Sequence, residues 1–326
     1  MKRINVIIIG AALVLGLSAC SVQPKKLTRI SIASQEWVGY GPFYLAQEKG
    51  FFVQDGIEVF FIDEELDSNR RDAFKAGILD CEVGTIDLLV SKRAQNTPVI
   101  AVLELDCSFG GDAIVADKSI KSLNDLIGKR IVFSRDDVSE TFISYLFHKK
   151  GLSLKDISII TRPPDKVADV FLGKEAEAVV TWEPWVTRAL ARPGAHILVS
   201  TRQTPEVIID TLNVREDFLK NNPQAVSALM RGWFKAIEYL KDHPEEGSRI
   251  IARHYKITPL AYRQSIERLK WIGYKEQIDP SQAKARKEIF DLIAQLKFNN
   301  GRISKLPDSE NSFDSVLIRK IYENSQ

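Results

Sequence analysis

The residues that could do chemistry in this chain lie mostly where predicted strands end, and they form no catalytic motif. The chain has no G-x-S-x-G, Walker A or EF-hand pattern, and its four histidines are scattered over predicted helix ends and one strand. Gly39-Tyr40-Gly41 resembles the start of a dinucleotide fingerprint, but the third glycine of that pattern falls at Tyr44, whose side chain blocks close helix–strand packing. We therefore expect a protein that is not an enzyme and carries no cofactor.

Polar and aromatic side chains at the carboxyl ends of predicted strands are the candidate binding residues. In open α/β sheets, ligands bind outside these strand ends. A carboxylate can hold a cation, and an aromatic ring can stack on a flat ligand or face a cation. Some of these side chains can instead serve turns, cap helices or belong to the core. The candidate ligand-binding residues are Trp37, Tyr40, Thr85, Asp106, Ser108, Asp112, Ser139, Trp182, Glu183 and Asp210.

The cysteines and histidines give no metal-binding pattern, since no CxxC or HExxH spacing occurs. Cys81 opens one predicted strand, and Cys107 lies beyond the end of another. If these strands are parallel, the thiols lie at opposite ends of the sheet, far beyond the ~7 Å Cα separation that a disulfide tolerates. We expect no metal site and two buried thiols; a disulfide between them is the alternative.

Alternating strands and helices must position the candidate residues. From Leu27 onward, short β-like runs alternate with helical segments, which predicts a parallel-rich sheet covered by helices. The same rhythm restarts after Gly110-Gly111, and an almost wholly helical tail follows a last strand at Val207–Val214. The predicted fold class is therefore α/β, with two units, a ligand cleft between them and a helical C-terminal tail.

The N-terminus differs in composition from the rest of the chain. The 326 residues include 45 Lys+Arg and 43 Asp+Glu, so the net charge of +2 gives no reason to expect a nucleic-acid or general membrane-surface binder. Lys2 and Arg3 precede an apolar run from Ile4 to Leu17. This run has about 14 residues, whereas a bilayer span needs about 20, so residues 1–19 are predicted to be a secretory signal peptide.

The stretch Leu17-Ser18-Ala19-Cys20 resembles a bacterial lipobox. That resemblance implies cleavage before Cys20 and acylation of its thiol, with chains such as palmitate, followed by a polar tether over residues 20–26. We expect an exported protein anchored by lipid to a bacterial membrane, with its body in the periplasm or at the outer face of the cell membrane. The alternative is an ordinary signal peptide cut near Ala19. The sequence leaves open which leaflet carries the anchor.

Several stretches give the chain a resemblance to bacterial ABC-transporter solute-binding lipoproteins. The family meant is the one that binds nitrate, sulfonates, taurine and thiamine-pyrimidine precursors, and the resemblance runs from about Thr28 to His254. It is carried by Trp37–Pro42 with Ala46–Phe52, Asp106–Ile114, Gly128–Ile131, Thr181–Trp185 and the helical stretch Val214–Tyr239.

The resemblance implies a periplasmic-binding-protein-like fold whose two lobes close on a ligand by hinge motion. Lobe 1 is expected to comprise residues 27–111 and 208–326, and lobe 2 residues 112–207. The implied function is capture of a small molecule and its delivery to an ABC permease and its ATPase. The protein is expected to be a monomer that meets the membrane through its lipid anchor only.

The charges near the expected cleft indicate what kind of ligand it takes. Asp106, Asp112, Glu183 and Asp210 would lie there, with Arg135 as the only obvious nearby cation. Buried carboxylates need a partner, so we expect an amine, zwitterion or pyrimidine-like ligand rather than an inorganic anion. Two other functions stay open: a periplasmic sensor that docks on a signalling receptor, and a thiamine-pyrimidine synthase-like enzyme. The export signal and the lack of a cysteine cluster argue against the enzyme.

Overall fold

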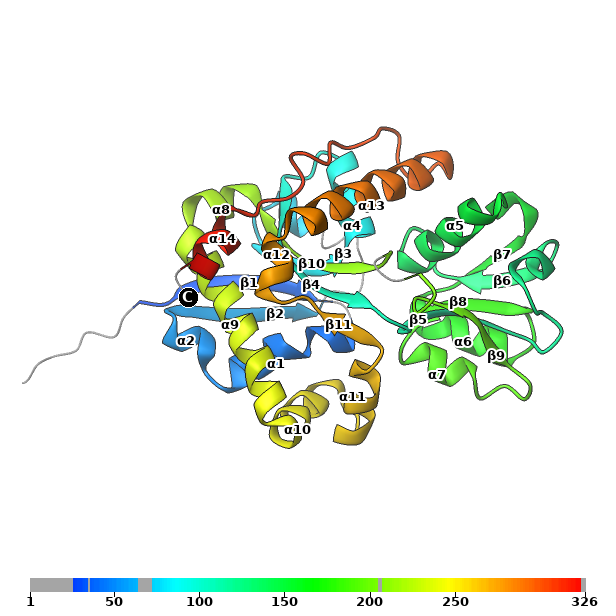
Figure 1. The fold of residues 1–326 in the computed structure, drawn as a ribbon, viewed down its shortest axis with the longest axis horizontal. Coiled ribbons are helices and arrows are strands. Elements are labelled where there is room, and N and C mark those ends of the chain that lie inside the picture. The colour runs from blue at the N-terminus through cyan, green and yellow to red at the C-terminus, as the bar shows by residue number, and fades with distance from the viewer. Residues whose placement is uncertain (1–25, 35, 64–71, 205–206, 324–326) are drawn as a thin grey trace, which may run out of the picture.

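Two β-sheets organise the protein, as a computed structural model shows for residues 26–34, 36–63, 72–204 and 207–323 (Figure 1). The first sheet has six strands in the order β11-β4-β10-β3-β1-β2, and the second has five in the order β7-β6-β8-β5-β9. The first contains β1 (Thr28–Ser34), β2 (Ile57–Asp63), β3 (Cys81–Thr85), β4 (Val99–Ser108), β10 (Ile209–Arg215) and β11 (Leu269–Trp271). The second contains β5 (Asp112–Ala116), β6 (Arg130–Phe133), β7 (Ser158–Thr161), β8 (Ala178–Trp182) and β9 (His196–Ser200).

Both sheets mix parallel and antiparallel pairs. β1 runs parallel to β2 and β3, and β6 runs parallel to β7 and β8, as consecutive β-α-β units require. β5 and β10, the strands that follow the two crossings between sheets, run antiparallel to both of their neighbours. The predicted α/β class with two units is confirmed, and the crossing strands make the sheets mixed.

Helices cover both faces of each sheet, and many begin where proline fits the first turn. Pro42, Pro223, Pro244, Pro259 and Pro280 all stand at such starts. The N-terminal half contains α1 (Gly41–Glu48), α2 (Phe51–Gln54), α4 (Ile86–Ala94), α5 (Val138–Lys150), α6 (Pro164–Leu172) and α7 (Trp185–Ala189). The predicted helical tail contains α8 (Glu216–Asn221), α9 (Pro223–Asp242), α10 (Pro244–Tyr255), α11 (Pro259–Ile266), α12 (Tyr274–Ile278), α13 (Pro280–Asn299) and α14 (Val316–Glu323). Short 3-10 helices occupy Val38–Tyr40, Leu123–Leu126 and Leu154–Asp156.

Each sheet is buried between two apolar clusters. In the first sheet, Phe43 of α1 packs with Trp233 of α9 on one face, and Phe290 of α13 packs on the other. In the second sheet, Phe142 of α5 lies on one face and Phe171 of α6 on the other. Burying one such side chain contributes about 1.5–3 kcal/mol. The clusters on its two faces therefore stabilise each sheet and hold its strands in place.

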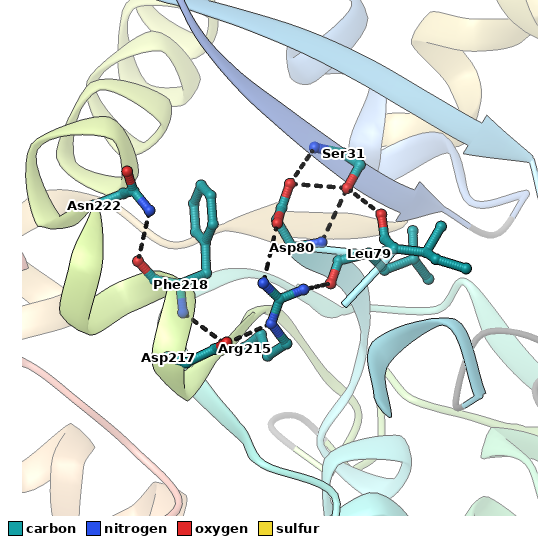
Figure 2. Close-up of polar contacts among 8 residues, drawn as sticks. Ser31, Leu79, Asp80, Arg215, Asp217, Phe218 and Asn222 are labelled. Carbon is teal, nitrogen blue, oxygen red and sulfur yellow. Dashed lines mark hydrogen bonds and ion pairs between the residues drawn. The ribbon is translucent and has the colours of Figure 1, made fainter. Parts of the chain in front are cut away.

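A polar network joins the end of β10 to the neighbouring strands β3 and β1, which precede it in the chain (Figure 2). Arg215 Nη1 donates to the carbonyl of Leu79 at 2.7 Å, and its Nη2 lies 3.5 Å from Asp80 Oδ1. Asp80 Oδ2 in turn accepts from the backbone N of Ser31 at 3.0 Å and from its Oγ at 2.9 Å. Arg215 therefore connects the end of β10 to the residues just before β3, and Asp80 connects these residues to the middle of β1.

No disulfide joins Cys81 to Cys107 in the described part of the chain. β3 and β4 both run antiparallel to β10, where Cys81 pairs with Val214 and Cys107 with Ile209. The two buried thiols therefore lie at opposite ends of the sheet, and the expectation of thiols rather than a bridge is confirmed.

The predicted signal peptide, the tether up to Lys25 and Cys20 lie outside the described residues. Within those residues, no helix has the length and apolar character needed to cross a bilayer.

Candidate ligand-binding site

Two short segments, 109–111 and 201–208, connect the sheets, and they meet at the candidate site. Residues 205 and 206 of the second segment are outside the described set. Ser108 Oγ lies 2.8 Å from Thr201 Oγ1, which also accepts from the backbone N of Gly110 at 2.7 Å. Ser108 Oγ further accepts from the backbone N of Asp112 at 3.1 Å. The predicted binding residue Ser108 thus joins the two crossing segments.

A row of side chains crosses the end of the first sheet beside these segments. Trp271 on β11 pairs with Asp106 on β4, Asp106 with Asp210 on β10, and Asp210 with Thr85 on β3. Residues directly opposite one another in antiparallel strands share a face, with Cβ atoms about 4.5–5.5 Å apart. A register shift between Asp210 and Thr211 brings the two aspartates opposite each other. The row therefore holds two carboxylates side by side.

Asp106 lies at the centre of this row and is fully buried. Its carboxylate accepts from Trp37 Nε1, which lies 3.1 Å from Oδ1 and 3.3 Å from Oδ2. A Cβ atom at Gly39 would lie 2.4 Å from Asp106 Oδ2, so only glycine allows the loop to approach this closely. The pKa of Asp106 is raised to about 8. Burial is the main cause and the charge of Asp112 adds to it, whereas the hydrogen bond from Trp37 lowers the pKa.

Two more predicted carboxylates surround Asp106. Asp210 accepts a short hydrogen bond from the hydroxyl of Tyr40, and burial together with the charge of Asp106 raises its pKa well above the usual range. Burial also raises the pKa of Asp112 to about 7, an effect that a hydrogen bond with Ser108 opposes and the charge of Asp210 reinforces. Three buried carboxylates therefore interact at the junction of the two sheets.

Thr85 and Ser139 mark the starts of two helices that face the junction. Thr85 Oγ1 donates to Asp87, a carboxylate in the first turn of α4. Ser139 is buried in the first turn of α5, and its backbone N donates to Asp137 at 2.8 Å. The structure thus brings Thr85 into the carboxylate row and places Ser139 at the start of the second sheet's helix.

Trp182 and Glu183 reach from the second sheet to the first. Trp182 pairs with Asp112 and packs against the core cluster of the first sheet. Glu183 accepts from Thr187, whose backbone N lies 3.1 Å from Oε2 and whose Oγ1 lies 3.0 Å from Oε1, and it forms an ion pair with Arg268. The charge of Glu183 is thus matched within the protein by Arg268, which follows α11 on the side of the first sheet.

Two residues of the helical tail that the sequence did not single out hold the Trp37 loop. Tyr255 donates its hydroxyl to the carbonyl of Trp37 at 2.6 Å, and Trp271 Nε1 donates to the carbonyl of Gly39 at 3.1 Å. Both lie more than 200 positions from the loop, within a region that shows only helical periodicity. No local motif signals such contacts.

A cavity of about 640 Å³ lies elsewhere, along α8, the start of α9 and α14. Its lining comes from elements on the first sheet's side alone, among them Arg93, Lys220 and Val316. A ligand there would touch neither the carboxylate row nor the second sheet. Across the described residues, no group of three or more His, Cys, Asp or Glu side chains could hold a metal ion.

Comparisons with known proteins agree with this architecture. A Bacillus subtilis (strain 168) protein named "Putative aliphatic sulfonates-binding protein" is 24% identical over 99% of this chain and 98% of its own length. The periplasmic aliphatic sulphonate binding protein SsuA from Escherichia coli superposes with a TM-score of 0.73 at 14% identity, covering 87% of this chain and 97% of its own. The periplasmic nitrate-binding protein NrtA from Synechocystis PCC 6803 gives a TM-score of 0.71 at 16% identity, over 92% and 89% of the two chains.

These likenesses identify the periplasmic binding protein fold, and the relatives are named for binding small solutes. The model of the family described as NMT1/THI5 like matches residues 37–247, which run from Trp37 through the second sheet to α10. The match includes every candidate binding residue from Trp37 to Asp210. The chain therefore belongs to the NMT1/THI5-like family.

Proposed function

We propose that this protein is a solute-binding lipoprotein that captures a small, nitrogen-containing ligand (an amine, a zwitterion or a pyrimidine-like molecule) by hinge closure and delivers it to an ABC importer. Lobe 1, residues 27–111 and 208–326, carries the first sheet, and lobe 2, residues 112–207, carries the second. The observation that carries the proposal is the set of three buried carboxylates, Asp106, Asp112 and Asp210, at the junction of the two sheets. Kinship with proteins named for solute binding supports the importer as partner.

The expected charge of the ligand follows from the absence of a basic partner for these carboxylates in the described part of the chain. Among the described residues, no lysine or arginine forms an ion pair with Asp106, Asp112 or Asp210. Like charges placed directly opposite each other on neighbouring strands destabilise a sheet, and ionised carboxylates are costly to bury unpaired. A protonated amine, or an aminopyrimidine-like group that donates hydrogen bonds, would stabilise the ionised carboxylates and so lower the pKa values that burial raises. A nitrate or a simple sulfonate would repel the ionised carboxylates and keep those pKa values high.

The aromatic residues beside the carboxylates suit the same ligand. Trp37 and Tyr40 are buried and bond directly to Asp106 and Asp210, while Trp182 comes from the other sheet. A cation over such a ring gains about 0.5–2 kcal/mol, more when the site is dry, and a flat heterocycle can stack on it. Because Asp106 and Asp210 lie on lobe 1 and Asp112 and Trp182 on lobe 2, closing the hinge would enclose the ligand between them.

Native mass spectrometry of the purified protein is the first test, since a small molecule that co-purifies would identify the ligand class. Isothermal titration calorimetry with amines, zwitterions such as taurine, aminopyrimidines, nitrate and simple alkanesulfonates would follow. We expect binding of members of the first three groups. Tight binding of nitrate or an alkanesulfonate, with no binding of any nitrogen-containing cation, would refute the proposed ligand class.

A further inference from the structure

Three side chains at and just beyond the end of α13, in lobe 1, contact α5 of lobe 2 or the loop that precedes it. Arg302 binds Glu140 through two hydrogen bonds, with Nε 2.8 Å from Oε2 and Nη2 2.7 Å from Oε1. Asn300 Nδ2 donates to Ser144 Oγ at 3.0 Å. The third residue is Lys297, whose Nζ lies 3.2 Å from Asp136 Oδ1. We call these contacts between the two elements the α13–α5 latch.

The local backbone on the α13 side aims Arg302 at its partner. α13 ends at Asn299, and Gly301 follows with a left-handed φ of +68°. The backbone N of Gly301 donates to Phe298 at 3.0 Å and that of Arg302 to Lys297 at 2.8 Å, the two bonds of a Schellman turn. This turn reverses the chain and brings Arg302 back beside the helix end.

The α5 side is equally fixed. Asp137 caps the helix by accepting from the backbone N of Ser139 at 2.8 Å. Glu140 accepts from the backbone N of Asp136 at 2.7 Å as well as from Arg302, so one carboxylate organises both the arginine and the loop that presents Asp136 to lobe 1. Contacts within lobe 2 therefore position both Asp136 and Glu140.

Burial distinguishes the latch from an ordinary surface ion pair. The Lys297 and Glu140 side chains are about 5% and 4% exposed, and Arg302 is 24% exposed. Two parallel hydrogen bonds between an arginine and a largely buried carboxylate are stronger and more directional than a solvated contact. By contrast, Lys287 on the same helix pairs with Glu310, also in lobe 1, with exposures of 36% and 72%.

Lys297 also has a partner within its own lobe. Its Nζ lies 3.2 Å from Asp87 Oδ2 at the start of α4. Burial alone lowers the pKa of Lys297, but the adjacent charges of Asp87 and Asp136 raise it above its ordinary value. The lysine is therefore bound to Asp87 within lobe 1 and to Asp136 of lobe 2 at once.

We propose that the α13–α5 latch is a built-in closing device that sets how much of the ligand-free protein is closed. The proposal rests on the hinge closure of the proposed function but not on the ligand's identity. In the described part of the chain, the backbone passes between the lobes at segments 109–111 and 201–208, and in the proposed opening at these segments α5 moves away from α13. Since the apparent affinity scales with the fraction of protein in the binding-competent state, the latch also tunes ligand affinity from outside the carboxylate row.

Small-angle X-ray scattering of the ligand-free full-length protein tests the latch. We expect Arg302→Gln and Lys297→Met each to increase the radius of gyration relative to the wild type, and the double variant to add little further. Lys287→Gln is the matched control, because it breaks an ion pair of the same helix within one lobe. In calorimetry, the latch variants should bind the ligand found by native mass spectrometry about ten-fold more weakly than the wild type does. The control variant should bind it as tightly as the wild type.

The outcomes separate the latch from the function on which it rests. Unchanged scattering in both latch variants would overturn the latch, even if their affinity fell. Hinge closure itself would be overturned by a different result. In that result, the ligand-free wild type has the same radius of gyration as the variants, and this radius does not fall when the ligand binds. Circular dichroism identifies a variant that does not fold. If a latch variant does not fold, Arg302→Lys takes its place, because it keeps the charge but loses the paired hydrogen bonds. An unchanged radius of gyration for Arg302→Lys would then overturn the latch.

Discussion

At the scale of single residues, Asp106 is the position where charge, burial and the proposed ligand meet. Replacing it with asparagine keeps its shape and an oxygen for Trp37 Nε1 but removes the charge opposite Asp210. We expect Asp106→Asn to weaken binding of a cationic ligand about 10- to 100-fold, since a hydrogen bond to a charged group contributes about 1.5–3 kcal/mol. Calorimetry measures the loss, and Asp242→Asn, an exposed carboxylate on α9, should bind as the wild type does.

The raised pKa values of Asp106 and Asp112 predict a pH-dependent stability. A folded-state pKa of about 8 or 7, against about 3.9 in the unfolded chain, means that the folded state binds more protons between these values. Stability from these groups is therefore fully present below about pH 4 and is lost as pH rises toward 8. In urea unfolding of the ligand-free protein at pH 5.5 and 8.5, we expect the stability of Asp106→Asn to fall less with pH than that of the wild type. An equal slope would contradict the assignment.

Cys20 carries the prediction about the membrane. If it is acylated, Cys20→Ser should abolish incorporation of labelled palmitate and move the protein from the membrane fraction to the soluble fraction, because the anchoring energy comes from the buried acyl chains. The matched control is Ser21→Ala, which leaves the thiol in place. Retention of Cys20→Ser in the membrane fraction would point to a different anchor.

Part of the site could be predicted from residue type and position alone. Trp37, Tyr40 and Asp106 follow predicted strands and Asp210 lies within one, and the structure joins Trp37 to Asp106 and Tyr40 to Asp210 through direct hydrogen bonds. The side-by-side position of the two aspartates could not be predicted, because it depends on a register shift between strands about 100 residues apart. Nor does the sequence reveal that Arg268 already matches Glu183, since that contact depends on the two sheets meeting.

At the scale of elements, β10 completes the first sheet, and Arg215 secures it there (Figure 2). Removing this side chain leaves the carboxylate of Asp80 and the carbonyl of Leu79 without a largely buried cation. We expect Arg215→Met to lower the free energy of unfolding by about 2–4 kcal/mol, a cost typical of breaking a buried ionic network. Arg29→Met removes the exposed Arg29–Glu58 pair of the same sheet and should cost less than about 1 kcal/mol. Similar midpoints for both variants in urea would refute the assigned role.

Element positions and element pairing differ in how far the sequence determines them. Strand β3 lies at Cys81–Thr85 as predicted, within the alternation of short strands and helices that the sequence shows locally. The place of β10 between β3 and β4 is specified by long-range packing and by the crossing segment that delivers it. The same distinction explains why the helical tail was predicted as helices while its contacts with the Trp37 loop were not.

At the scale of the whole molecule, the crossing segments connect the sheets, and the proposed hinge closure requires that they also permit relative motion. Gly110 adopts a φ of +103°, and a Cβ atom there would lie 2.8 Å from Arg202 Nε. An alanine at this position would be strained in the backbone and crowded by the second crossing segment, at a cost of about 1–3 kcal/mol. Because the strain falls on the crossing itself, it should alter the balance between open and closed forms without touching the carboxylate row.

Gly110→Ala therefore separates motion from contact. We expect this variant to show a different radius of gyration without ligand and a weaker ligand affinity, whereas its carboxylate row stays intact. Gly128→Ala is the matched control, since Gly128 also has a positive φ, +73°, but its added Cβ would meet nothing within 4 Å. It should lose stability from backbone strain and keep its affinity and scattering. Equal affinity losses in both variants would show that general destabilisation, rather than the crossing, sets ligand binding.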